Sequence, residues 1–425
     1  MAVSIDPGLG LSTALAVDLF AEYVSPGKAA FFRAAGIEFA MGRREGARIW
    51  DLDGKHELIN CHCNGGVFNL GHRHPEVIAA LKSALDHYDI GNHHLPSGPR
   101  ARLAEKLAAC TPGRLHHTIF AVGGGEAVDT AIKIARKATQ RKKIVSALGG
   151  YHGHTGYALA TGNAKFSRPF LAESPEFVQV PFNDLDALDA ALDGDVAAVI
   201  LETIPATLGM PLPDDGYLAA VAQRCQANGS LYIADEVQTG LGRTGTLWGI
   251  EHFGVEPDIL VTAKGLSGGI YPIAATIITP ELEQVFHDDP FAHISTYGGA
   301  EVGCAVAEKV LGISSAPPFL AQVNRISQRI YDGLCAVQLQ HPAAIAEIRR
   351  VGMFMGVKFH GEHWGRLMSV TAFQAGLLCV YAANDASVLQ FLPPLITDEA
   401  TADEILQRFA KAVALAEGIL GGGAA

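Results

Sequence analysis

Between about residue 100 and residue 300 the sequence alternates short apolar runs with helical patterns, and this alternation restricts the possible fold more than any other feature. The apolar runs end at Val122, Ala147, Leu201, Ala234, Thr262 and Ile278. Strands that alternate with helices in this way build a largely parallel sheet covered by helices on both faces. Ligands of such sheets bind at the carboxyl ends of the strands. We therefore predict an α/β fold with a binding site along one edge of its sheet.

Weaker patterns on either side of this block predict a second, smaller α+β domain. They fall at 12–23 (helix), 48–55 (hairpin), 319–340 (helix), 353–359 (strand), 380–389 (helix and strand) and 398–420 (helix). We expect residues 61–315 to form the large domain and residues 316–425 the small one, which residues 1–60 join. Residues 421–425, Gly-Gly-Gly-Ala-Ala, are predicted to be a frayed tail.

The composition argues against several classes of protein. The sequence has 32 basic and 44 acidic residues, so it lacks the positive surplus of a nucleic-acid binder. It has no run of about 18 apolar residues, which argues against a membrane span. Asp6 and the absence of a basic leader argue against a signal peptide, so the cytoplasm is the expected compartment. Seven cysteines without a Cys-x-x-Cys pair favour buried free thiols over disulfides or zinc.

A glycine run at 123–125 follows one predicted strand and opens a predicted helix. Apolar residues at helical spacing indicate the helix: Ala127, Ala131, Ile134, Ala135 and Ala138. Backbone N–H groups at a helix N-terminus attract anions, and glycines let a phosphate come close. A glycine turn also serves ordinary strand-to-helix geometry, so this run alone leaves both interpretations open.

Two charged residues follow apolar strands further along the chain. Asp235 ends one strand, and a buried carboxylate is costly unless a cation or proton donor faces it. An ordinary ion pair or a helix cap would explain it equally well. Lys264 follows the next strand, 29 residues later, where it could be a phosphate ligand, a surface charge or a Schiff-base amine with a lowered pKa.

Together these residues match the needs of one cofactor, pyridoxal phosphate. This cofactor requires a phosphate cup, an acid that keeps its ring nitrogen protonated, an aromatic cover and a lysine that bonds its aldehyde. Tyr151 follows the strand that ends at Ala147 and can serve as the aromatic cover. The sequence thus offers a candidate for each part.

Five motifs resemble the class III (subgroup II) pyridoxal-phosphate aminotransferases. They occur in the order and spacing of that family: GHRHPEV at 71–77, DEVQTGLGRTG at 235–245, PDI at 257–259, KGLSGG at 264–269 and STYGG at 295–299. The family includes the ornithine, acetylornithine and 4-aminobutyrate enzymes and glutamate-1-semialdehyde aminomutase. The resemblance spans almost the whole chain. It implies fold type I, with a mostly parallel seven-stranded sheet in the large domain and a small domain from both chain ends.

The resemblance implies roles around the cofactor ring. Lys264 would form the Schiff base and carry a proton between the substrate carbon and the cofactor. Asp235 would pair with the ring nitrogen, and Gln238 with the ring hydroxyl. Val237 would pack on one ring face and Tyr151 on the other.

It also implies the phosphate contacts and the quaternary structure. Gly124 and Gly125 would donate backbone N–H groups to the phosphate. Thr296 would reach the phosphate of the neighbouring subunit, which implies a homodimer with shared active sites. Glu202 and His152 match family positions near the cofactor.

The sequence departs from the family at four places. The phosphate cup usually reads Asn-Ser-Gly-Ser/Thr-Glu-Ala, whereas residues 122–127 read Val-Gly-Gly-Gly-Glu-Ala and lack a hydroxyl donor. Thr207 stands where the ornithine-type enzymes have a gate glutamate. His154 and Gln390 stand where many relatives have substrate-binding arginines.

The two missing arginines bear on the substrate. Arginine is the favoured partner of a carboxylate, because its guanidinium can donate two parallel hydrogen bonds, and an amide cannot replace its charge. We therefore expect a small-molecule amine or ω-amino donor that has no carboxylate at that point, and a keto or aldehyde acceptor. A competing explanation is that Arg168 or Arg100 supplies the clamp instead.

Other functions remain as alternatives. His154 matches the aminomutase pattern, so an aminomutase or an amino-acid racemase or epimerase is the second candidate. A dehydrogenase would need a GxGxxG run, which the glycine turn is not. A catalytically inactive binding or scaffold protein with this fold would not need Lys264, Asp235 and Gln238 together. The adjacent His93 and His94 lack a third ligand and are interpreted as loop residues, so no metal site is predicted.

Overall fold

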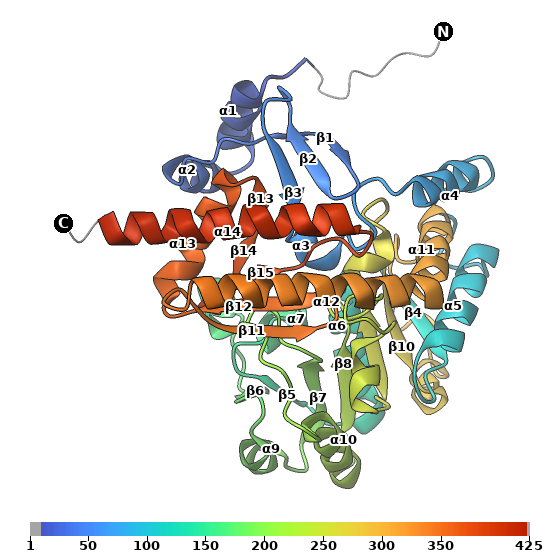
Figure 1. The fold of residues 1–425 in the computed structure, drawn as a ribbon. Helices are drawn as coiled ribbons and strands as arrows, with labels where there is room; N and C mark the ends of the chain where they lie inside the picture. The colour runs from blue at the N-terminus through green and yellow to red at the C-terminus, as the bar shows by residue number, and fades with distance from the viewer. Residues whose placement is uncertain (1–9, 423–425) are drawn as a thin grey trace.

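The computed structural model describes residues 10–422, and its centre is one large mixed sheet (Figure 1). The strand order is β4 (His117–Ala121), β10 (Ala274–Ile278), β9 (Ile259–Thr262), β8 (Leu231–Asp235), β7 (Val196–Glu202), β5 (Lys143–Ala147) and β6 (Phe177–Val180). The neighbours from β9 to β6 are parallel, and only β10 runs antiparallel to its neighbours. The expected seven-stranded, mostly parallel sheet is therefore confirmed.

Helices cover both faces of this sheet. They include α5 (Gly98–Cys110), α6 (Gly124–Thr139), α7 (Gly156–Thr161), α8 (Ala164–Ser167), α9 (Leu185–Ala191), α10 (Tyr217–Asn228) and α11 (Glu301–Ser314). Alternate strand residues enter different cores, because successive side chains of a strand point to opposite faces. Val199 belongs to the core that contains α10, and its neighbour Ala198 to the core that contains α6. The sheet is thereby held between two apolar layers.

The chain ends build two smaller sheets beside the large one. Their strands are β1 (Met41–Glu45), β2 (Arg48–Asp51), β3 (Glu57–Asn60) and β13 (Leu377–Leu378) in one, and β11 (Ile345–Val351), β12 (Phe354–Phe359), β15 (Asp385–Phe391) and β14 (Val380–Ala382) in the other. Strand β13 pairs with β3 in parallel, so C-terminal and N-terminal segments share one sheet. The division at 1–60, 61–315 and 316–425 stays a prediction.

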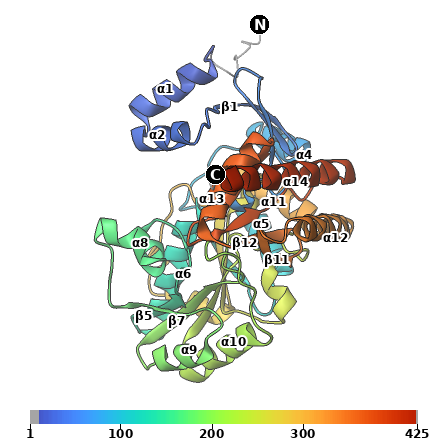
Figure 2. The same ribbon diagram turned by 60° about the vertical axis from the view of Figure 1, so that its left-hand side comes forward.

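Helices complete this part of the molecule. They are α1 (Thr13–Tyr23), α2 (Pro26–Ala34), α3 (Cys63–Gly66), α4 (Pro75–Leu85), α12 (Pro317–Gln340), α13 (Glu362–Gln374) and α14 (Glu399–Gly422). Short 3-10 helices lie at η1 (Arg168–Phe170), η2 (Gly249–Phe253), η3 (Lys264–Ser267) and η4 (Pro280–Phe286). Helices α1 and α2 stand out from the rest of the chain (Figure 2).

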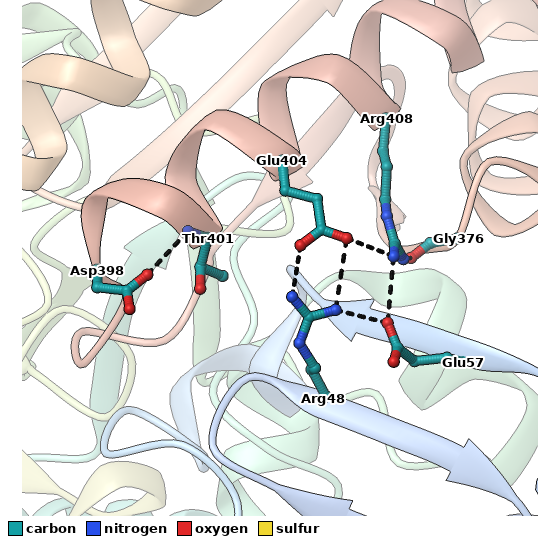
Figure 3. A network of polar contacts seen from close by, with 7 residues as sticks. All are labelled: Arg48, Glu57, Gly376, Asp398, Thr401, Glu404 and Arg408. Carbon is teal, nitrogen blue, oxygen red and sulfur yellow. Dashed lines mark hydrogen bonds and ion pairs between the residues drawn. The ribbon is translucent and has the colours of Figure 1, made fainter.

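An ion-pair network joins the two chain ends (Figure 3). Arg48 on β2 pairs with Glu404 on α14 and with Glu57 on β3, the latter at 2.5 Å. Arg408, one turn after Glu404, binds that carboxylate at 2.5 Å and Glu57 at 3.1 Å. The network ties α14 to the N-terminal sheet.

Several local expectations are met and others need correction. Helix α12 begins at Pro317, because prolines fit the first turn of a helix, where no N–H is needed. The expected tail is wrong at Gly421 and Gly422, which continue α14, and residues 423–425 lie outside the described part. So do residues 1–9, including Asp6. All seven cysteines are free, as expected, but only five are buried, and Cys110 and Cys335 are partly exposed. Among residues 10–422, no helix has the length and apolar character to cross a membrane.

Candidate active site

A cavity of about 400 Å³ opens at the carboxyl ends of the parallel strands. Its wall contains nine of the residues that the sequence had nominated: Gly124, Gly125, Tyr151, His152, Glu202, Asp235, Val237, Gln238 and Lys264. They come from the last residues of β7 and β8 and from the segments that follow β4, β5, β8 and β9. The parallel sheet brings them together because its strands end at the same edge.

Among the residues that the structure describes, Lys264 is the only lysine or arginine in the cavity wall. It is the first residue of η3 and has a φ of +38°, a left-handed conformation that side chains rarely adopt. Its Nζ donates a hydrogen bond to Gln238 Oε1 at 2.6 Å. Burial lowers the pKa of the Lys264 amine, while the charges of Glu202 and Asp235 act in the opposite direction. A lowered pKa brings the amine closer to its nucleophilic form.

Asp235 and His152 form a buried pair beside the lysine. His152 Nδ1 lies 2.7 Å from Asp235 Oδ2, and the backbone N–H of Val237 donates to Asp235 Oδ1 at 3.0 Å. Burial acts to lower the pKa of His152, but its hydrogen bond and charge interaction with Asp235 outweigh this, so its pKa is raised. His152 Nε2 is buried without a hydrogen-bond partner among the described residues.

Glu202 shapes the loop that carries the aromatic residue. One of its carboxylate oxygens accepts the backbone N–H of Tyr151 at 2.9 Å, and the other accepts that of Ala206 at 3.2 Å. Burial raises the pKa of Glu202 to about 7. The carboxyl group is therefore a hydrogen-bonding support for Tyr151 and a titratable group near neutral pH.

The glycine run forms an open cradle at one end of the cavity. Gly123 caps α6, and the first N–H groups of this 16-residue helix have no partner inside the helix. A Cβ on Gly124 would stand 3.2 Å from Val237 Cγ1. The glycines thus keep clear a space that exposes backbone donors, as a phosphate requires.

The three residues nominated for substrate contact lie outside the cavity wall. The ring of His154 lies 5.3 Å from that of Tyr151 and 5.1 Å from that of Phe166. Gln390 reaches the site through Gln238, whose Nε2 donates to Gln390 Oε1 at 3.4 Å.

Thr207, the third of these residues, takes part in a link between two parts of the fold. Its hydroxyl oxygen accepts a hydrogen bond from Asn384 Nδ2 at 3.3 Å. The same Nδ2 donates to the carbonyl of Gly149 at 2.6 Å. Asn384, between β14 and β15, escaped the sequence analysis because nothing in its local pattern points to residues so distant in the chain.

The other nominated arginines are engaged elsewhere. Arg168 pairs with Glu173 at 3.3 Å. Arg100 donates to the carbonyls of Asn92 and Gly299, both at 2.7 Å. Neither lines the cavity of Lys264, and the competing explanation for the missing clamp stays a prediction.

Thr296 is exposed and does not line the cavity of Lys264. Its neighbours Ser295 and Gly298 line a second cavity of about 760 Å³, together with His93. The ring of His94 lies 5.2 Å from that of Phe291. Within residues 10–422, no cluster of three or more His, Cys, Asp or Glu side chains could hold a metal ion.

Residues that the sequence analysis missed also approach Lys264. The cavity wall also contains the apolar residues Val67, Ile270, Pro272 and Ile273 and the polar Ser267. A Cβ on Gly65 would stand 3.3 Å from Lys264 Nζ. Burial and the charge of Lys264 lower the pKa of His62 to about 4. Residues 267–273 could have been found from their closeness to Lys264 in the sequence, whereas Gly65 and His62 carry no comparable signal.

Comparison with known proteins decides the family. The model of the family described as aminotransferase class-III matches residues 33–413, which is most of the chain. The chain belongs to the class III aminotransferases. It is 54% identical over 400 residues to an uncharacterized aminotransferase of Archaeoglobus fulgidus, with 94% of each sequence covered.

Solved structures of this aminotransferase family have the same fold. The ornithine aminotransferase of Toxoplasma gondii ME49 is 27% identical, with a TM-score of 0.88 over 96% of this chain and 97% of that chain. A further structure of the T. gondii ornithine aminotransferase, with PLP partially occupying its active site, is 26% identical and has a TM-score of 0.84, covering 94% and 98%. The chain therefore has the fold type I architecture of these enzymes.

Class III aminotransferases use pyridoxal phosphate, and the cavity fits this cofactor. An open glycine cradle lies at the start of α6, a buried carboxylate lies at the end of β8, and an amine with a lowered pKa follows β9. The backbone N–H donors suit a phosphate, the carboxylate suits a protonated ring nitrogen as an acceptor, and the amine suits an aldehyde as a nucleophile.

Proposed function

We propose that this aminotransferase moves an amino group from a primary amine or ω-amino donor to a keto or aldehyde acceptor by a ping-pong mechanism. The observation that carries the proposal is the cavity wall itself. Of residues 10–422, Lys264 is the only lysine or arginine in this wall, and no arginine of that part of the chain lies there to bind a carboxylate. An amine without a carboxylate near its reacting carbon suits such a wall.

Each residue around Lys264 has a proposed part in the reaction. Bound pyridoxal phosphate supplies an electron sink that makes the C–H next to the donor nitrogen acidic. The Lys264 amine would accept the proton from that carbon and return it, and Gln238, whose Oε1 accepts a hydrogen bond from Nζ at 2.6 Å, would hold the amine in place. Asp235, which lies 2.7 Å from His152 Nδ1, would pair with the protonated ring nitrogen.

The remaining contacts orient the cofactor and the donor. Tyr151 and Val237 line the cavity and would pack against the cofactor ring, and Gly124 and Gly125 would bind the phosphate through backbone N–H groups. Glu202 supports the Tyr151 loop through the hydrogen bond at 2.9 Å. Thr207, His154 and Gln390, which lie outside the cavity wall and carry no arginine fork, would contact the donor.

We propose that the active enzyme is a homodimer in which Thr296 completes the partner's site. Thr296 is exposed in the single chain. Large apolar side chains around it are also exposed, with relative exposures of 65% for Leu95, 52% for Phe291 and 60% for Tyr297. An apolar patch of this kind suits a protein interface.

A half-reaction assay tests the donor proposal. Cofactor-loaded enzyme is mixed with amines and with ω- and α-amino acids of matched chain length, and the visible absorbance of the bound cofactor is followed. Loss of absorbance with amines, recovered by a keto acid, supports the proposal. Activity confined to α-amino acids would contradict it, and recovery without a keto acid would favour an aminomutase or epimerase.

A further inference from the structure

The loop after Tyr151 packs closely against the glycine cup. Gly153 has a φ of +130°, and a Cβ on it would stand 2.7 Å from the Cα of Gly125. A Cβ on Gly125 would in turn stand 2.7 Å from the hydroxyl oxygen of Thr155. The space that a side chain at position 125 would need is therefore occupied by Thr155.

Asp129 holds Thr155 in this place. Its Oδ2 accepts a hydrogen bond from Thr155 Oγ1 at 2.8 Å, and its Oδ1 accepts one from the backbone N–H of Ala158 at 2.7 Å. Asp129 lies four residues after Gly125 in α6, so both face the same side of the helix. One carboxylate thus ties the start of α7 to the first two turns of α6.

The direction of these hydrogen bonds decides what Thr155 can do. A hydroxyl has a single hydrogen to donate, and Thr155 donates it to Asp129. A phosphate that only accepts hydrogen bonds would gain no donor from it. Thr155 is therefore suited to position the cup and not to bind the phosphate directly.

We propose that Asp129 and Thr155 are positioning residues that hold the glycine cup in the shape that receives the cofactor phosphate. Three successive glycines have few contacts of their own and great conformational freedom, which a ligand would otherwise have to restrict. The Asp129–Thr155 pair restricts it beforehand. This inference rests on the proposed position of the phosphate at Gly124 and Gly125.

Cofactor titration of matched variants tests the proposal. Apoenzyme of the wild type, Thr155→Val and Thr155→Ser is titrated with pyridoxal phosphate, and bound cofactor is measured by equilibrium dialysis. Valine keeps the shape but loses the hydroxyl, so its dissociation constant should rise about tenfold, whereas serine should stay within about twofold of the wild type. Equal weakening by serine and valine, or none by valine, would overturn the proposal.

A second pair of variants checks the other partner. Asp129→Ala loses both hydrogen bonds and should weaken cofactor binding at least as much as Thr155→Val. Asp129→Asn can accept from Ala158 and donate to Thr155, so it should stay close to the wild type. If Asp129→Asn weakened cofactor binding as much as Asp129→Ala, the charge of Asp129 and not its two hydrogen bonds would be what matters. That result would refute the proposal.

Two readouts separate this role from plain stability and from the proposed function. The kcat of Thr155→Val at saturating cofactor should equal that of the wild type, and its apoenzyme should keep the wild-type melting temperature. If Thr155→Val destabilised the apoenzyme as much as the holoenzyme, the Asp129–Thr155 pair would only stabilise the fold. That result would defeat the inference. Failure of the wild type itself to bind the cofactor would instead defeat the proposed function.

Discussion

Two clusters of acidic and basic side chains in this molecule contain similar groups and behave in opposite ways. The cavity holds Asp235, His152, Glu202 and Lys264. The network between the chain ends holds Arg48, Glu57, Glu404 and Arg408 (Figure 3). Burial lowers the pKa of Lys264 and raises that of Glu202, which moves both toward neutrality.

In the network the pKa shifts of Arg48 and Glu404 favour their charged forms. The hydrogen bond to Glu404 raises the pKa of Arg48, and the hydrogen bond to Arg48 lowers the pKa of Glu404. Partial exposure keeps the desolvation cost small there, with about 30% of the Arg48 and Glu57 side chains exposed. Burial with incomplete pairing produces reactive groups, whereas pairing beside solvent produces a structural contact.

The largest expected effect comes from removing the cavity amine. Lys264→Ala should lower the rate of proton transfer by about 10⁴-fold, since no other lysine or arginine lines the cavity. Lys264→Arg, which keeps the charge, should be nearly as inactive. The rate of the donor half-reaction, measured with cofactor added in excess, checks this. A Lys264→Ala enzyme with more than a tenth of the wild-type rate would remove Lys264 from the chemistry.

Asp235→Asn removes the charge that His152 faces. We expect kcat to fall by about 10²-fold, because breaking a buried charge pair typically costs about 3–5 kcal/mol and only part of this affects the reaction. Unfolding of the apoenzyme would show how much of the loss is structural. An unchanged kcat would contradict the role given to the carboxylate.

Glu202 should make stability depend on pH. Burial raises its pKa from 4.5 to about 7, so its contribution to stability is fully present below about pH 4.5 and is lost as the pH rises through 7. Glu202→Gln should therefore lose less stability between these values, by roughly 2–3 kcal/mol. Denaturant unfolding of the apoenzyme over this pH range measures it. Glu236 serves as a control, because it is a buried carboxyl outside the cavity whose pKa is also raised to about 7. Its contribution to stability should show the same dependence on pH.

The smallest effect is expected in the network of the chain ends. Arg48→Met should lower the free energy of unfolding by about 1 kcal/mol and leave kcat unchanged, because this pair is partly exposed and distant from the chemistry. Arg48→Lys keeps the charge and should lose less. A change in kcat without a change in stability would break the distinction between the two clusters.

The sheet was largely predictable from the sequence because most of its strands are uniformly apolar. All seven residues of β7 are buried, which produced a clear apolar run. Strand β6 was missed because it is short, lies at the sheet edge and contains Gln179 among partly exposed residues. Helix α2 was missed because its surface is mostly exposed and its apolar residues form no stripe.

The sequence by itself determined which side chains end the strands. Glu202, Asp235 and Lys264 follow apolar runs, and local periodicity is readable from neighbouring residues. Only the tertiary structure decided which distant residues meet them. Gly65 lies against Lys264, and Thr155 fills the place of a side chain at Gly125. Such contacts and the pKa shifts depend on packing and desolvation, which arise only when segments far apart in the chain come together.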